Sequence, residues 1–378
     1  STRKESSAAS DVYKRQVRPG CALMNIDVVG AGIIGLTTAL TLADRGHTVT
    51  VHDPDPASGA SHHAGGMLAP TAEVVYKQDP LFPLMRASAE WYPELINLTA
   101  KYSDLPTGYR TDGTLVVARD IADKTHLEEL TEYQSRHGMA VDKLTTREAR
   151  KLEPALSPAI NGAVRIDGDH QVQPRLFTRA LLDACRRANV TFTTDLIDSL
   201  DKLDKLDNAD QVVVANGLGA SQLIPSLDLR PVYGDVLHVR VPKHQYPLLT
   251  RVVRGFVEDR PVYLIPREDG TLTIGATTRE DGRDQPQVQG IHQLLRDAIE
   301  LVPALEECDF VEATAGARPG TPDDLPYLGR IDERTVVSTG YFRHGILLAG
   351  LGARVGAVLV DRHEPSIDLT ACDPRRHS

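Results

Sequence analysis

Apolar and polar positions near the start of the chain follow two different periods, which predict a strand, a helix and a second strand. The apolar run 26–29 has the length and β-branched content of a short buried strand. Apolar residues then recur at helical spacing over 33–45, and Gly46 is placed to end that helix. A second apolar run follows at 49–51. This order is a βαβ unit, which indicates a parallel sheet.

Glycines fill the turn between the first strand and the helix. Gly30, Gly32 and Gly35 form G-x-G-x-x-G, and Asp53 ends the second strand 18 residues after Gly35. An acidic residue at this distance is placed to accept hydrogen bonds from a ribose hydroxyl, so the segment predicts dinucleotide binding. The alternative is a glycine-rich turn that only packs a helix on a sheet.

Further along the chain the pattern changes to alternation typical of an antiparallel sheet. Segments 231–241, 248–256, 261–266 and 271–277 alternate or run apolar, and Asp269-Gly270 supplies a hairpin turn. Helical spacing recurs over 80–103, 120–137 and 287–301. The fold class expected is α/β (α+β), in which a Rossmann-type nucleotide-binding domain carries an inserted antiparallel-sheet substrate domain.

Both domains are expected to be discontinuous, because the sheet-forming block lies between nucleotide-type segments. We expect the nucleotide-binding domain at 24–105, 166–230 and 311–378, and the substrate domain at 106–165 and 231–310. Residues 1–23 are polar and lack the apolar core of a signal peptide. They are expected to be a non-native or disordered leader, with Met24 as the natural start.

Composition narrows the class of protein. The net charge of −10 argues against a nucleic-acid partner, and no apolar run is long enough to span a bilayer. Four isolated cysteines, Cys21, Cys185, Cys308 and Cys372, indicate free thiols in a reducing cytoplasm rather than a zinc site. Adjacent His62 and His63 do not make a metal site, since successive residues face one ion poorly.

One arginine stands out near the end of the chain. Arg318 lies in "TAGARPGTPDDLPYLG", among small residues, glycines and prolines. A planar guanidinium in such a setting is suited to holding an anion. The alternative is a surface arginine paired with Asp323 or Asp324.

The segments "GAGIIG", "AGGMLAPTAE", "ARPGTPDDLPYLG" and "YFRHGILLA" resemble the FAD-dependent D-amino acid oxidase superfamily. Within it they are most similar to the glycine oxidase branch of bacterial thiamine biosynthesis, over residues 25–362. The resemblance implies FAD as cofactor, with the pyrophosphate at the helix N-terminus at Ile33 and a second helix N-terminus after Gly345. No cysteine lies in 315–323, so the FAD is expected to be non-covalent.

The resemblance also implies roles for individual residues. Arg318 would bind the substrate carboxylate, Tyr263 would assist it, and Arg343 would lie near flavin and substrate. Tyr263 could instead be a packed strand tyrosine, and Arg343 a helix-start arginine that binds only backbone. The residues expected to contact FAD are Gly30, Gly32, Ile33, Ile34, Gly35, Asp53, Pro54, Ser61, His62, Gly65, Gly66, Met67, Ile197, Arg343, His344, Gly345, Ile346 and Leu347.

Two positions depart from the family pattern. Thr278 stands where the family has methionine, and Pro261 where it has histidine. Met67 and Glu73 match residues of the pocket and its mouth. The resemblance therefore predicts the reaction more firmly than it predicts which amine is the preferred substrate.

The function expected is a cytoplasmic FAD-dependent amine oxidase. It would use oxygen to convert glycine, sarcosine or D-alanine to an imine and hydrogen peroxide, and would supply the imine for thiazole synthesis. One alternative is a broader D-amino acid oxidase or dehydrogenase. A second is a flavin-binding subunit or tRNA-modifying partner that oxidises no free amine. The sequence leaves open whether the chain forms a homo-oligomer.

Overall fold

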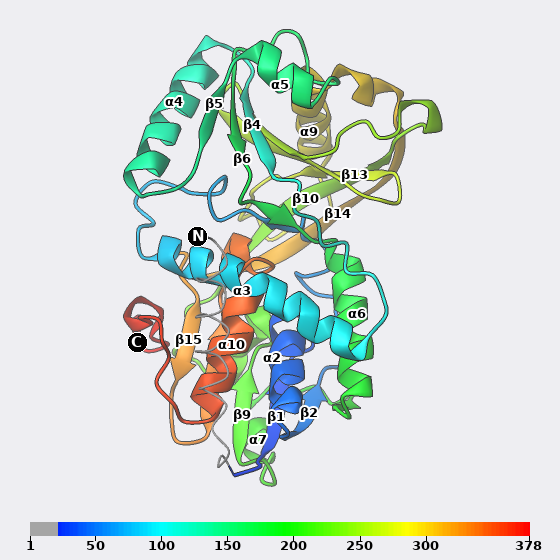
Figure 1. The fold of residues 1–378 in the computed structure, drawn as a ribbon. Coiled ribbons are helices and arrows are strands. Elements are labelled where there is room, and N and C mark those ends of the chain that lie inside the picture. Colours follow the sequence, from blue (N-terminus) through cyan, green and yellow to red (C-terminus); the bar gives the residue numbers. More distant parts are fainter. Residues whose placement is uncertain (1–21) are drawn as a thin grey trace, which may run out of the picture.

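The computed structural model describes residues 22–378, which form two lobes stacked along the long axis of the molecule (Figure 1). The lower lobe in that view is built on a six-stranded sheet, and the upper lobe on an eight-stranded one. The expected leader, residues 1–23, lies outside the described residues apart from its last two, and so does Cys21.

The six-stranded sheet contains the predicted βαβ unit. Its strands, in order across the sheet, are β15 (Tyr327–Arg330), β16 (Thr335–Thr339), β9 (Gln211–Val214), β1 (Asn25–Val29), β2 (Thr48–His52) and β8 (Thr191–Thr193). All neighbours pair in parallel except β15 with β16. The Rossmann-type expectation is therefore confirmed.

Four helices lie on one face of this sheet (Figure 1). They are α2 (Ile33–Asp44), α3 (Leu81–Tyr102), α6 (Pro174–Arg187) and α10 (Ala349–Val360). Helix α2 is almost wholly buried, because it packs against α6 and α10 as well as the sheet. This explains its apolar residues on every face, which an exposed amphipathic helix would lack.

The eight-stranded sheet forms the second lobe. Its strands are, in order, β14 (Asp309–Gly320), β10 (Arg230–Arg240), β13 (Thr271–Gly275), β12 (Arg260–Pro266), β11 (Val252–Val257), β4 (Thr114–Ala118), β6 (Gly162–Ile166) and β5 (Asp142–Leu144). The pairings are antiparallel except that β4 and β11 run parallel. The expected domain boundary at residue 311 falls inside β14, because this strand belongs to the large sheet over its whole length.

Helices on both faces of the large sheet supply its cores. Helix α9 (Val288–Leu301) covers one face with Leu294, Ala298 and Leu301, and α4 (Ile121–Arg136) contributes Leu127 and Leu130 to the core on the other. The remaining elements are short. They are β3 (Met67–Leu68), paired with β7 (His170–Gln171), and the helices α5 (Thr146–Leu152), α7 (Leu200–Asp204) and α8 (Ala220–Leu223).

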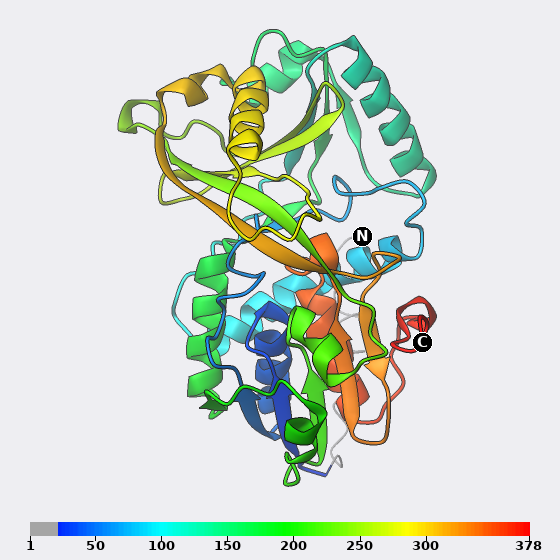
Figure 2. The ribbon, with the colours of Figure 1, turned by 180° about the vertical axis from the view of Figure 1, so that it is seen from behind.

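Two long strands connect the lobes. In the view from behind, β10 and β14 run side by side from the upper lobe down to the lower one (Figure 2). Their register pairs Arg318 with Val232. This brings the C-terminal part of β14 into the space between the lobes. No helix within residues 22–378 is long and apolar enough to cross a membrane.

Candidate active site between the two lobes

A cavity of about 470 Å³ lies where the two sheets meet. The loop after β1, the loop 53–67 and the turn after β9 line one end. The large sheet lines the other end. The segment 338–346 runs along both, since Thr339 Oγ1 donates to the Gly217 carbonyl in the turn after β9. Both predicted clusters, the nucleotide-binding glycines and the candidate substrate residues, therefore belong to one continuous space.

The glycines of the first loop have separate structural reasons. Gly30 has a φ of +102°, and a Cβ there would lie 2.7 Å from the Cα of Asn216. A Cβ at Gly35 would clash with the carbonyl oxygen of Gly30, so Gly35 permits close packing of helix on strand. At Gly32 a Cβ would meet only the Oγ of Ser61, at 3.5 Å. The backbone at Gly32 is thus left open toward the cavity.

The amino-terminus of α2 is suited to an anion. Its N-cap residue Gly32 provides no side-chain hydrogen bond, and the first turn carries no acidic residue. The Ile33 amide donates to the Oγ of Ser61 at 3.0 Å, and the Ala31 amide donates to Asp53 Oδ2 at 2.6 Å. A helix start whose N-cap residue is a glycine with open backbone fits a pyrophosphate group.

The small-residue loop is held close to the large sheet. A Cβ at Gly65 would come within 2.7 Å of the Tyr263 hydroxyl, and one at Gly66 would clash with the Val172 carbonyl. Beneath the loop, Arg267 donates to the carbonyls of Gly65 and Val172, the latter at 2.8 Å. Burial lowers the pKa of Arg267 to about 10. The backbone of this loop can therefore approach a flat ring system closely.

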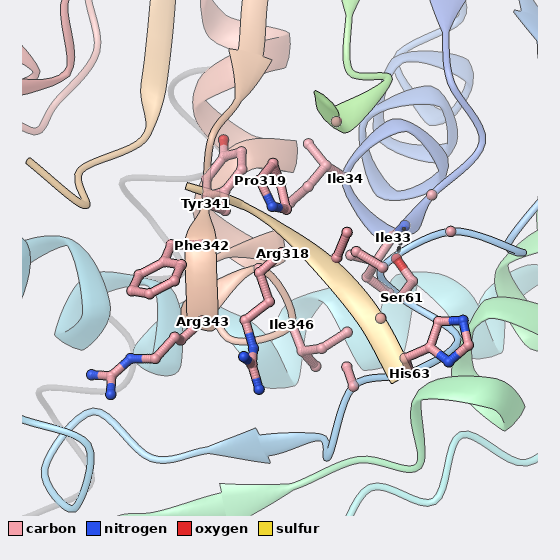
Figure 3. A pocket seen from close by; sticks show the side chains of 18 of the residues that line it. Ile33, Ile34, Ser61, His63, Arg318, Pro319, Tyr341, Phe342, Arg343 and Ile346 are labelled. Carbon is pink, nitrogen blue, oxygen red and sulfur yellow. Dashed lines mark hydrogen bonds between the residues drawn. The ribbon is translucent and has the colours of Figure 1, made fainter. Parts of the chain in front are cut away.

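Arg318 extends from β14 into the cavity, which Arg343 also lines (Figure 3). Its Nη1 donates only to the backbone carbonyls of Thr277, at 3.2 Å, and Tyr233, at 3.4 Å. Within residues 22–378 no carboxylate lies within 4 Å of its guanidinium nitrogens. Burial lowers the pKa of Arg318, because water solvates this charge poorly.

The acidic residues that follow Arg318 are engaged elsewhere. Asp323 pairs with Arg376 at 2.8 Å, and Asp324 pairs with Arg230 at 2.8 Å. The surface-pair alternative for Arg318 is therefore wrong.

Tyr263 and Arg343 line the same end of the cavity. Burial raises the pKa of Tyr263 to about 12, so its hydroxyl remains a donor at neutral pH. The Nε of Arg343 is buried and has no hydrogen-bond partner among the described residues. Met67, Thr278 and Pro261 also line the cavity.

The fold brings two further charged residues, Arg254 and Glu73, together at the cavity. Arg254 of β11 lines the cavity, although the sequence pattern did not predict it there. It contacts Glu73, whose position at the cavity was expected. Register places Arg254 directly opposite Tyr263 on the neighbouring strand. The available signal was a lone arginine inside the otherwise apolar run "VVRGFV".

The remaining predicted residues divide into two groups. The predicted contact residues that line the cavity are Gly30, Gly32, Ile33, Ile34, Asp53, Ser61, Gly65, Gly66, Met67, Arg343, Gly345 and Ile346. Those that do not line it are Gly35, Pro54, His62, Ile197, His344 and Leu347.

Local geometry explains three of these differences. His63 lines the cavity and His62 does not, because neighbouring side chains leave the backbone in different directions, here with an interplanar angle of 73° between the rings. Ile197 packs into a core beside β9. The last helix begins at Ala349 rather than after Gly345, because a tight turn over Phe342–His344 comes first.

Comparison with known proteins agrees with this geometry. The family model for FAD dependent oxidoreductases (DAO) matches residues 26–359. Glycine oxidase from Geobacillus kaustophilus is 32% identical over 372 residues, covering 93% of this chain and 97% of that protein. Its crystal structure superposes with a TM-score of 0.85 at 31% identity, covering 94% of this chain and 100% of that one.

A bifunctional protein ThiO/ThiG from Synechocystis is also similar. It is 32% identical over 92% of this chain, which spans 53% of that longer protein. The glycine-rich loop, the start of α2 and the open backbone at Gly32 fit FAD, the cofactor that the family description names. The chain therefore belongs to the FAD-dependent oxidoreductase family of D-amino acid oxidase type.

Proposed function

We propose that this protein is a glycine oxidase, which oxidises the amine of glycine and of other small amino acids. The observation that carries the proposal is Arg318, a poorly solvated guanidinium at the cavity with no carboxylate partner in the described chain. A planar fork of this kind matches a carboxylate with two parallel hydrogen bonds. Similarity to glycine oxidases over 93–94% of the chain supports the same substrate class.

Arg318 and Tyr263 would position the substrate. The carboxylate lies on the Arg318 guanidinium, and the protonated Tyr263 hydroxyl donates a further hydrogen bond. With this end of the molecule held, the Cα of glycine has few orientations left, and restricted orientation is itself a large part of catalysis.

Bound FAD supplies the redox chemistry, in which the amine is oxidised to an imine and oxygen is reduced to hydrogen peroxide. The residues that would hold it are the backbone of 30–34, Asp53, Ser61 and the loop at Gly65. The chain contributes binding, orientation and exclusion of water, as is usual in cofactor enzymes. A substrate that binds with its amine neutral needs no side-chain base.

Anaerobic addition of glycine tests the proposal. The visible flavin absorbance of the purified protein should be bleached, and oxygen should restore it with release of peroxide. Peroxide release measured side by side should be faster with glycine, sarcosine or D-alanine than with D-proline or D-phenylalanine. Bleaching by the larger D-amino acids alone would support a broad D-amino acid oxidase, the alternative left open by Thr278 and Pro261.

The FAD is proposed to be non-covalent. Of the described cysteines, Cys185, Cys308 and Cys372, none lines the cavity. Acid precipitation should release all yellow colour into the supernatant. Colour that stays with the pellet would indicate a covalent bond.

A place in thiamine biosynthesis is proposed from the relatives that join a ThiO part to a ThiG part. The imine would then be handed to an enzyme of thiazole synthesis. Deleting the gene should create a thiamine requirement that an externally supplied thiazole relieves. Growth of the deletion strain without either supplement would contradict this assignment.

A further inference from the structure

Arg254 and Glu73 form an ion pair in the wall of the substrate end of the cavity. Arg254 Nη1 lies 3.4 Å from Glu73 Oε1, and the two side chains are only 10% and 13% exposed. Both residues line the cavity. The Nε of Arg254 is buried without a hydrogen-bond partner among the described residues. The pair is thus part of the site and keeps an unused donor.

The Glu73 carboxylate faces the groups that would hold the substrate. Burial lowers the pKa of Arg318, and the nearby negative charge of Glu73 opposes this shift. Burial raises the pKa of Tyr263, and the charge of Glu73 adds to that shift. The other cavity-lining carboxylates in the described chain, Asp53 and Asp55, belong to the nucleotide end. Glu73 is therefore the carboxylate that a bound substrate would meet.

The neighbours of Glu73 leave Arg254 as its main counter-charge. His344 Nδ1 lies 3.8 Å from Glu73 Oε2. Burial among arginines lowers the pKa of His344 to about 3, so its ring is neutral at neutral pH. Asp169 is buried and accepts hydrogen bonds from the amides of Thr71 and Ala72.

We propose that Arg254 and Glu73 act as a charge filter for the substituent on the substrate amine. Arg254 holds the Glu73 carboxylate in the cavity wall. A small neutral substituent is accepted beside it, and a substituent with its own carboxylate is repelled. The inference rests on the proposed function, since it assumes that Arg318 holds the first carboxylate.

The two residues of the pair have different parts in this filter. Glu73 supplies the repulsion, because like charges in a poorly solvated site interact strongly. Arg254 holds the Glu73 carboxylate in place in the cavity wall, at 3.4 Å from its Nη1. In Glu73→Gln, which lacks this negative charge, the guanidinium of Arg254 would instead attract a second carboxylate.

Two ethers that cannot be oxidised as amines provide the test. Methoxyacetate and diglycolate differ only in one added carboxylate, and their binding is read from the perturbed visible spectrum of the flavin. In the parent protein methoxyacetate should bind more tightly. In Glu73→Gln the ratio of the two dissociation constants should shift toward diglycolate by tenfold or more.

The double variant Glu73→Gln/Arg254→Met distinguishes a change in charge from a change in the packing of the cavity wall. It should lose most of the gain for diglycolate, because the attracting guanidinium is gone. Glu300→Gln, which breaks a surface pair with Arg119, should leave the ratio as in the parent. If Glu73→Gln does not retain FAD, Glu73→Ser makes the same test.

A ratio within threefold of the parent in Glu73→Gln would overturn the filter, and so would an equal gain in the double variant. The filter would also be overturned if one of the two ethers gave no spectral change with the parent protein and none with Glu73→Gln. These measurements need no turnover. If the parent protein oxidises no amine, the proposed function is refuted. The ratio of the two dissociation constants still tests the filter in that case.

Discussion

The guanidinium of Arg318 fills the space that a side chain on Gly234 would occupy. A Cβ at Gly234 would overlap the terminal atoms of Arg318, which reaches across from the neighbouring strand β14. Gly234 pairs with Gly316 in the register of β10 and β14. The direction of the candidate carboxylate-binding residue therefore depends on a glycine far away in the sequence.

Gly234→Ala should displace Arg318 without unfolding the protein, since the clash is with the end of a flexible side chain. We expect kcat/KM for glycine to fall by roughly tenfold or more, about 1.4 kcal/mol, with FAD content unchanged. Steady-state kinetics and flavin absorbance measure the two effects. Gly168→Ala is the control, because a Cβ there meets nothing within 4 Å. Equal kinetics for both variants would contradict the prediction.

Arg318→Ala should leave the substrate carboxylate buried without its partner. Breaking a buried charged pair costs about 3–5 kcal/mol, or roughly two to four decades in kcat/KM. Arg318→Lys should recover only part of this, because an ammonium lacks the two-pronged geometry. A kcat/KM of the alanine variant within about threefold of the parent would assign the anion to another residue, with Arg343 the next candidate.

Arg267→Met should weaken FAD binding and lower the melting temperature. It removes donors from the Gly65 and Val172 carbonyls and from Gln171 Oε1. Each buried acceptor left unsatisfied costs about 1–3 kcal/mol. Thermal melting and titration of the apoprotein with FAD measure the two effects.

The matched control for Arg267→Met is Arg240→Met, at an exposed residue whose guanidinium donates only to the Asp269 carbonyl among the described residues. Arg267→Lys, which keeps the charge and loses the fork, should lie between parent and Arg267→Met. A FAD affinity of Arg267→Met equal to that of the control would show that the loop is held by packing alone.

Asp169 should make stability depend on pH. Burial raises the pKa of Asp169 to about 7, against about 3.9 in an unfolded chain. Between these values the folded chain holds a proton that the unfolded chain releases. Its stabilising contribution is thus fully present below about pH 4 and is lost as pH rises through about 7.

Asp169→Asn removes this titration. The melting temperature of the variant minus that of the parent should rise between pH 5 and pH 8 and then level off. Asp167→Asn, at an exposed aspartate two residues earlier, should show no such trend. A difference for Asp169→Asn that is constant across this range would contradict the assignment.

Local patterns were sufficient for the nucleotide-binding part of the fold. The strand, helix and second strand around Gly30 follow from residue periodicity within about 30 positions. The glycines there are required by the backbone conformation and by close packing of helix on strand. Both requirements arise between residues that are near one another in the sequence. The resemblance to a known family added Arg318, Tyr263 and Arg343, and all three lie at the cavity.

Only the tertiary structure decided which charges meet. Asp323 and Asp324 follow Arg318 by only five and six positions, yet they pair with Arg376 and Arg230, 53 and 94 positions away from them. Arg254 reaches Glu73 across 181 positions. Ion pairs in a folded chain are set by strand register and by which faces the sheets present to each other. Neither can be derived from the spacing of the residues, because the long segments between them leave their distance undetermined until the lobes pack.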